Sequence, residues 1–179
     1  GLALTIDTVS AACPGLRYTS LAARHAHPLL GSRGNLTGGR VSLVGRPLLV
    51  LGKLEMSGKW PLDPSVAAKL KTSLLLQTST LLKGKHHLDS AVHEDSLDIF
   101  FQGFLFRLRL VSSAEQDKWA YMKLDEINES VRDDALLPLH HSHVHSLCAI
   151  HPSYPDAVRL LRLWLARGLF SGHVPVEMV

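Results

Sequence analysis

The sequence lacks the features that mark membrane, secreted and metal-scaffolded proteins. Its 179 residues include only two cysteines, Cys13 and Cys148, which lie far apart and fit no metal-ligand spacing. No apolar run is long enough to span a bilayer, and the N-terminus has no basic region followed by a signal-peptide core. The simplest interpretation is a folded protein of a reduced intracellular compartment, with one domain or one and a fraction.

A strong charge of either sign is also missing. The formal net charge is +3 and the isoelectric point is near 9.0. Such a mildly basic balance permits contact with RNA but does not require it. The chain starts directly with a strand-like segment, and residues 175–179 look like the opening of a helix, so we expect a fragment of a longer protein.

The distribution of apolar residues predicts an α+β part followed by an all-α part. Strands are expected at residues 2–9, 16–21, 46–51, 97–102 and 104–111, with Gly103 between the last two. In the last strand, residues 104, 106, 108 and 110 would share one face and residues 105, 107 and 109 the other. Residues 31–40 hold four glycines and are expected to form a mobile loop. Residues 113–135 are acidic and polar, and helices are expected at residues 137–150 and 156–169.

The most specific local signal is the segment 53–82, which predicts a strand, a tight turn and a capped helix. Ser57-Gly58 ends the apolar run, and Pro61 cannot continue a strand ladder because it has no N–H. Asp63 before Pro64 is the typical order of an N-cap and a first helical residue. Apolar residues then recur at helical spacing: Val66, Ala67, Leu70, Leu74, Leu81 and Leu82.

Four segments, in order along the chain, resemble the nucleolar RNA-associated protein (Nrap) family. Residues 54–61, Leu-Glu-Met-Ser-Gly-Lys-Trp-Pro, are similar to the family's acidic-x-Ser-Gly-x-Trp-Pro turn, and residues 103–110 to its Gly-Phe-x-Phe-Arg-Leu strand. A third match covers residues 151–154, 158–165, 171–174 and 177, and a weaker one covers residues 16–20; residues 22–45 depart from the family. The motif residues are Glu55, Ser57, Gly58, Trp60, Pro61, Gly103, Phe104 and Trp164.

This resemblance implies a nucleotidyltransferase-like fold related to poly(A) polymerase and oligoadenylate synthase (PAP/OAS). Residues 1–112 would be a nucleotidyltransferase-like α+β domain with a mixed sheet. Residues 113–135 would be a connector, and residues 136–179 the first helices of a truncated, all-α PAP/OAS-like domain.

The acidic residues do not match an active enzyme of that kind, which holds two metal ions on carboxylates at alternate positions of a strand. Leu30-Gly31-Ser32 imitates the hydrophobic-Gly-Ser motif that binds phosphates, but no acid occurs in the next dozen residues. Acids elsewhere are single or wrongly placed: Glu55, Asp95 and Asp98, and the pair Glu115 and Asp117 in a polar segment. We therefore expect a degenerate domain with no catalytic residue, no metal and no cofactor.

The basic residues support an RNA hypothesis. Guanidinium groups bind phosphate bidentately and stack on bases, and three arginines lie on one side of the helix expected at residues 156–169. Ordinary solvated charge, with arginine stems packed on the helix, is the alternative. The resemblance favours RNA or ribonucleoprotein contact. The candidate RNA-binding residues are Arg159, Arg162, Arg167, Lys53, Lys59, Lys71, Arg107 and Arg109.

Two further features have two interpretations each. His141 and His145 would be one turn apart on a helix and could ligate Zn²⁺, but no acid or cysteine completes the site, so a polar, packing or RNA-facing surface is favoured. Trp60 could stack on a base or plug the junction of strand and helix. Its place between Lys59 and Pro61 favours the plug.

In function, the resemblance implies a non-catalytic scaffold of the nucleolar small-subunit processome, acting in pre-ribosomal RNA processing and small ribosomal subunit assembly. The implied partners are pre-ribosomal RNA, small nucleolar ribonucleoprotein and other processome proteins, without a membrane. Two alternatives stay open. One is an active RNA-terminal nucleotidyltransferase whose carboxylates lie outside this segment, and the other is a protein–protein module without RNA contact.

Overall fold

The computed structural model describes residues 4–21, 47–55, 60–61, 63–113, 115 and 129–168, with side chains in the last segment described from residue 136. The chain divides into two compact units, which are described separately. The first holds Gly1–Ser10 and His25–Lys123, and the second holds Ala11–Arg24 and Leu124–Val179. The chain is α+β, as predicted. The predicted domain limits at residues 112 and 135 stay a prediction.

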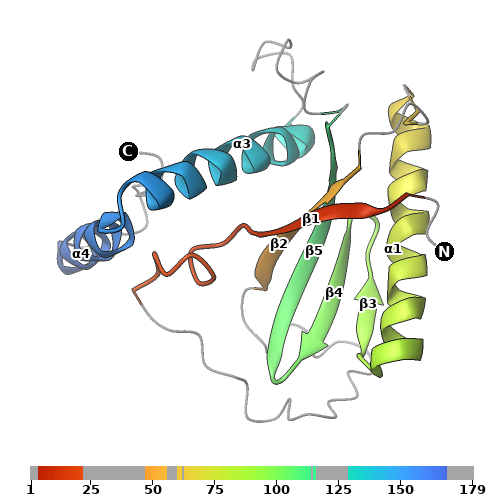
Figure 1. The fold of residues 1–179 in the computed structure, drawn as a ribbon, viewed down its shortest axis with the longest axis horizontal. Helices are drawn as coiled ribbons and strands as arrows, with labels where there is room; N and C mark the ends of the chain where they lie inside the picture. The colour runs from red at the N-terminus through yellow and green to blue at the C-terminus, as the bar shows by residue number, and fades with distance from the viewer. Residues whose placement is uncertain are drawn as a thin grey trace. The chain divides into compact units, whose positions relative to one another are not determined.

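A five-stranded mixed sheet forms the body of the first unit (Figure 1). Its strands are β1 (Ile6–Ala11), β2 (Leu48–Leu54), β3 (Ser90–Val92), β4 (Ser96–Phe101) and β5 (Phe104–Ser112). The order across the sheet is β1-β2-β5-β4-β3, with β2 parallel to β5 and β4 antiparallel to both β5 and β3. The strands predicted near residues 46–51, 97–102 and 104–111 are confirmed, and the short strand β3 was not predicted.

Helix α1 (Pro64–His86) begins where the sequence predicts it. The Asp63 carboxylate accepts a hydrogen bond from the backbone N–H of Ser65 at 2.8 Å, and Pro64 occupies the first helical position. His87, with φ 52°, ends the helix in the left-handed conformation, and its N–H donates to the carbonyl of Leu82. Each end of α1 therefore has a cap that satisfies one of the backbone groups left unpaired at helix termini.

The core of this unit lies between α1 and one face of the sheet. Leu74 and Leu75 of α1 are buried in one cluster with Leu97, Leu108 and Leu110 of the strands. Trp60 is half-buried and packs against the same cluster, which supports its expected role as a plug. By contrast, Val66 and Leu81, predicted to be on the apolar side of the helix, are 47 % and 39 % exposed.

The strand predicted at residues 16–21 is wrong. Leu16 and Arg17 donate backbone N–H bonds to the carbonyl of Cys13 at 3.1 and 3.2 Å, and Thr19 donates to the carbonyl of Pro14 at 3.0 Å. These local turns use the donors that a strand would offer to a neighbour. The glycine-rich residues 31–40, predicted to be a mobile loop, lie outside the described residues.

Two helices form the described part of the second unit after residue 128: α3 (Glu129–Ile150) and α4 (Tyr154–Arg167). Both predicted helices are confirmed, but α3 begins at Glu129, within the expected connector, and carries Pro138 in its interior. Val158 and Leu165 of α4 are buried together with Tyr154 beside them. None of the described helices has the length and hydropathy that a membrane span requires.

Candidate functional site: a buried carboxylate on the polar sheet face

The hairpin of β4 and β5 places charged residues opposite each other. Gln102 and Gly103 form its two-residue turn with φ of 49° and 80°, the positive values of a type I′ turn. The resulting register pairs Asp98 with Arg107, and it pairs Ser96 with Arg109. Because side chains alternate between faces, these four residues lie on the face opposite the one that carries the α1 core.

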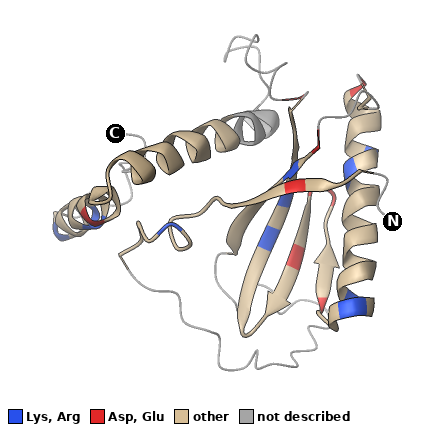
Figure 2. Cartoon of the chain, viewed as in Figure 1, with Lys and Arg blue, Asp and Glu red and all other residues tan. Residues whose placement is uncertain are grey.

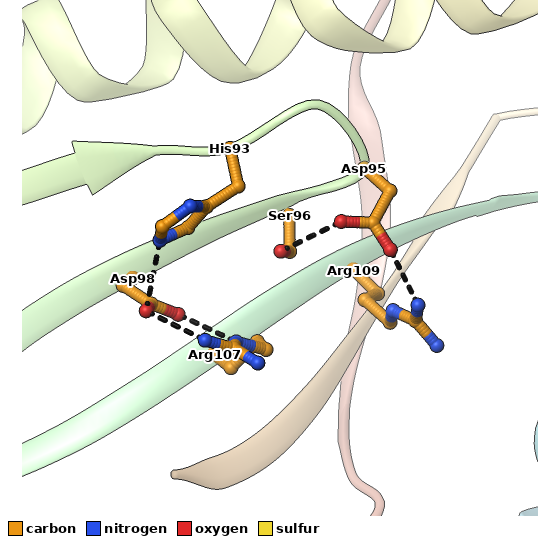
Figure 3. A network of polar contacts seen from close by, with 6 residues as sticks. All are labelled: His93, Asp95, Ser96, Asp98, Arg107 and Arg109. Carbon is orange, nitrogen blue, oxygen red and sulfur yellow. Dashed lines mark hydrogen bonds and ion pairs between the residues drawn. The ribbon is translucent and has the colours of Figure 1, made fainter. Parts of the chain in front are cut away.

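Asp98 is completely buried. Figure 3 shows its contacts with Arg107 and His93. Its two carboxylate oxygens accept hydrogen bonds from Arg107, at 2.7 Å from Nε and 2.8 Å from Nη2. The Nε2 atom of His93 lies 3.1 Å from the same carboxylate. Such a bidentate guanidinium–carboxylate pair is among the strongest polar contacts in proteins and balances the buried charge.

A second acid, Asp95, is paired with Arg109, which lies on β5 together with Arg107 (Figure 3). Arg109 donates to one oxygen of Asp95, and the Ser96 hydroxyl donates to the other at 3.0 Å. Partial burial acts to raise the pKa of Asp95, but the hydrogen bonds from Arg109 and Ser96 outweigh it and hold that pKa below its usual value. Half of this side chain is exposed, in contrast to Asp98.

Electrostatics joins the two pairs into one network. The pKa of Arg107 is raised chiefly by its hydrogen bond to Asp98, against the effect of burial, and the charge of Asp95 raises it further. Acidic and basic segments lie on neighbouring strands in Figure 2. We call the six residues His93, Asp95, Ser96, Asp98, Arg107 and Arg109 the polar sheet face.

The polar sheet face does not fit the pair of metal ions that a nucleotidyltransferase needs. A catalytic metal requires carboxylate oxygens that are open to it. Here both oxygens of Asp98 accept from Arg107, and Asp95 is paired with Arg109. Within the described part of the chain, no group of three or more His, Cys, Asp or Glu residues is arranged to hold a metal ion.

The predicted RNA-binding residues of the first unit differ in their surroundings. Arg107 and Arg109 are engaged in the polar sheet face, and Lys71 is paired with Glu115 at 2.7 Å, with both side chains less than one fifth exposed. Lys53 is exposed at the end of β2. Lys59 lies outside the described residues, as does Asp117.

The motif residues of the first unit are mostly structural in their contacts. Glu55 accepts a hydrogen bond from the Thr5 hydroxyl, and its backbone N–H donates to the Thr5 carbonyl at 3.1 Å. Phe104 is half-buried, with its ring centroid 6.4 Å from that of Phe106. Pro61 is half-buried, Gly103 forms the hairpin turn, and Ser57 and Gly58 lie outside the described residues.

The arginines of α4 lie in more open surroundings. Arg159 pairs with Asp156 one turn earlier, and both side chains are exposed. Arg167 is exposed near the end of the helix, and Arg162 is half-buried. On the same helix Leu160 and Trp164 are each 68 % exposed, so the motif residue Trp164 is not part of the buried core.

His141 and His145 on α3 stack on each other, with ring centroids 5.9 Å apart and an interplanar angle of 27°. Burial lowers the pKa of His141, and the nearby charges of Arg17 and His145 lower it further. These contacts fit the packing interpretation of the histidines. The RNA-binding roles of all eight predicted basic residues stay predictions.

Sequence reasoning missed the pairing of Asp98 and its contact with His93. A signal was available in the hairpin, because a two-residue turn at positions 102 and 103 sets the register of both strands. Counting outward from that turn puts residue 98 opposite residue 107 and residue 96 opposite residue 109, as observed. The contact with His93 depends on β3, which was not predicted.

Comparison with known proteins places this geometry in context. Residues 1–149 match the family described as Nrap protein nucleotidyltransferase domain 4. Nucleolar protein 6 of mouse is 28 % identical over an alignment 195 residues long. That alignment covers 96 % of this chain and 17 % of the mouse protein. The human protein of that name is 29 % identical over 96 % of the chain, and that of Drosophila virilis 30 % over 95 %. The chain thus spans about one sixth of the length of these curated relatives.

Proposed function

The chain belongs to the Nrap family, and on this premise we propose that it is a non-catalytic scaffold segment of the nucleolar small-subunit processome. It would hold pre-ribosomal RNA, small nucleolar ribonucleoprotein and processome proteins during RNA processing and small-subunit assembly. In this proposal residues 1–112 are a degenerate nucleotidyltransferase-like domain and residues 113–135 a connector. Residues 136–179 then begin a PAP/OAS-like helical domain.

The bidentate pair of Asp98 with Arg107 is the observation that carries the non-catalytic role. Two-metal nucleotidyl transfer needs carboxylates that bind cations and release them through the reaction cycle. A fully buried carboxylate whose two oxygens accept from a guanidinium at 2.7 and 2.8 Å has no open oxygen for that purpose. The polar sheet face is thus chemically satisfied without substrate or metal.

Nucleolar location and ribosome biogenesis are proposed from the relatives that carry the name Nucleolar protein 6. The open arginines of α4, Arg159 and Arg167, support RNA contact within this role. A surface pair such as Arg159 with Asp156 is weak, so a phosphate group can replace the carboxylate at small cost.

A protein–protein module without RNA contact is the second candidate, and one observation favours it. Leu160 and Trp164 are spaced four residues apart on α4, and each is 68 % exposed. An exposed tryptophan beside an exposed leucine is typical of surfaces that bind another protein.

Nucleotide extension separates the scaffold from an active enzyme. The longer protein that contains this chain would be incubated with an RNA primer, labelled nucleotides and Mg²⁺ or Mn²⁺, beside an active poly(A) polymerase as positive control. We expect no primer extension. Extension by the wild-type protein that survives Asp98→Asn would mean that catalytic carboxylates lie outside this chain. Extension abolished by Asp98→Asn, in a variant that thermal unfolding shows to be folded at the assay temperature, would overturn the non-catalytic role of this domain.

A further inference from the structure

Tyr18 has a backbone conformation that a tyrosine rarely adopts. Its φ is 59°, in the left-handed region, where a bulky residue is an outlier. The bond from the Thr19 N–H to the Pro14 carbonyl, at 3.0 Å, has the pattern of a Schellman motif, which requires this conformation at the residue before Thr19. Glycine is the usual residue there because it has no Cβ atom to clash with the backbone. Tyrosine is therefore a strained choice for this turn.

The fold shows no return for that strain. Tyr18 is 76 % exposed, the largest exposed fraction among the large apolar and aromatic residues that the structure describes as exposed. Its ring therefore contributes little burial to the core. His87 and Gln102 also have positive φ, but His87 ends α1 and Gln102 forms the turn between β4 and β5. A strained residue whose side chain the fold does not use points to a role in recognition.

We infer that Tyr18 is a stacking platform for an unpaired RNA base, which the strained turn presents to the RNA. This inference rests on the RNA contact proposed above and narrows it to single-stranded RNA at this position. Proteins that bind single strands stack the bases on aromatic side chains, whereas the bases of a duplex are already stacked on each other. Every base has a π-face, so one ring requires no particular sequence.

The compact unit that contains Tyr18 also contains cations suited to RNA. Residues 11–24 belong to the second unit, as does α4 with its exposed residues Arg159 and Arg167. Single-stranded RNA offers negative phosphates and flat bases, which match guanidinium groups and an aromatic ring. A tyrosine that anchors a protein partner usually lies at the centre of a packed patch, but the residues beside Tyr18 in the turn, Arg17 and Thr19, are polar. The exposed ring therefore fits a base better than a protein surface.

The test compares RNA affinity for single strands and duplexes. The longer protein that contains this chain would be titrated with a labelled, unstructured uridine oligonucleotide and with an RNA duplex of equal charge. Tyr18→Gly should weaken single-strand binding by about fivefold or more, because one base–aromatic stack contributes at least that much. Duplex binding should stay unchanged. The slope of log affinity against log salt concentration should also stay the same, because stacking neutralises no phosphate.

Two further variants and a stability measurement separate the ring from the backbone. Tyr18→Phe keeps the ring and should bind the oligonucleotide as the wild type does. Tyr18→Asn removes the ring but keeps a residue that tolerates positive φ, and should lose affinity as Tyr18→Gly does. In thermal unfolding of the full chain, Tyr18→Gly should melt at the wild-type temperature or above it, because glycine relieves the left-handed strain.

Each outcome decides the inference. Wild-type RNA binding that Tyr18→Gly leaves unchanged would overturn the stacking role while the proposed RNA contact stands. Equal weakening for the single strand and the duplex would show that no unpaired base is stacked. Melting of Tyr18→Gly several degrees below the wild type would mean that the ring packs on the fold, and would overturn the role in recognition.

Two outcomes concern the partner itself. Loss of a processome protein from complexes of Tyr18→Gly, with RNA affinity unchanged, would assign the ring to a protein partner and overturn base stacking. Absence of RNA binding by the wild-type protein would overturn the proposed RNA contact and base stacking together.

Discussion

At the scale of single residues, the two arginine–aspartate pairs of the polar sheet face have the same chemistry but different surroundings. Asp98 has no exposed side-chain surface, whereas Asp95 is 54 % exposed. Water screens an exposed pair and can solvate either partner alone, while a buried pair leaves an uncompensated charge when one partner is lost. Loss of one partner should therefore lower the free energy of unfolding more for the buried pair than for the exposed pair.

Neutralising the buried acid should cost much more stability than neutralising the exposed one. Asp98→Asn should lower the free energy of unfolding by about 3 kcal/mol, the lower end of the range for a broken buried pair, because Arg107 keeps some contact with water. Asp95→Asn should lower it by about 0–1 kcal/mol. Urea unfolding of both variants measures the difference, and equal losses would contradict the distinction drawn from burial.

At the scale of helices and strands, two local sequence signals, a helix cap and a hairpin turn, contain enough information to predict the structure around them. Asp63 before Pro64 predicted the start of α1 because a cap needs only neighbouring atoms, and the structure confirms it. The turn at Gln102-Gly103 likewise contained the register of β4 and β5. The contacts of the polar sheet face could have been read from that register, apart from His93, which depends on a three-residue strand too short to give a periodic signal.

Other parts of the fold depend on interactions that a local pattern does not contain. Residues 16–21 are apolar enough for a strand, but the turn that begins at Cys13 and Pro14 takes their backbone donors. Val66 and Leu81 share the helical spacing of the core residues yet are exposed, because the packed side of α1 is set by where the sheet lies. Helical periodicity predicts which side of a helix is apolar, but tertiary packing decides which residues of that side are buried.

Two glycines provide a test at this scale, because they differ in what surrounds them. A Cβ atom at Gly52 of β2 would lie 3.1 Å from Leu110 Cδ2, 3.2 Å from Leu108 Cδ1 and 3.4 Å from Ile6 Cγ2. A Cβ atom at Gly84 of α1 would have no heavy atom within 4 Å apart from its chain neighbours and the backbone of its own helix. Gly52→Ala should therefore lower the free energy of unfolding by about 1–3 kcal/mol through overpacking.

Gly84→Ala is the matched control and should raise that free energy by about 1 kcal/mol, because alanine favours the helix interior over glycine. Thermal or urea unfolding of the two variants should give shifts of opposite sign. A stabilising Gly52→Ala would show that the leucine side chains move aside without loss and that the β2–β5 packing is looser than its distances indicate.

At the scale of the whole molecule, the basic residues form two groups: those of the sheet unit that are paired with acids, and those of α4 that lie in more open surroundings. Net charge is only +3, and several cations of the sheet unit are engaged with acids: Arg107, Arg109 and Lys71. On α4, Arg159 pairs with Asp156, an exposed acid on the same helix, and such an exposed pair is weak. Phosphate recognition by this chain should therefore depend more on α4 than on the sheet.

RNA affinity of the longer protein should reflect this division in its dependence on salt. Each phosphate contact with single-stranded RNA contributes about 0.7 to the slope of log affinity against log salt concentration. Replacing Arg159 and Arg167 together by glutamine should reduce the magnitude of that slope by roughly 1.4 and weaken binding at low salt. Filter binding or fluorescence anisotropy with a pre-ribosomal RNA fragment across a salt series measures this slope.

The control replaces Lys83 and Lys85, two exposed cations at the end of α1, by glutamine and removes the same total charge. Equal changes in the two double variants would show that RNA senses only net charge, and no change in either would favour the module that binds protein alone.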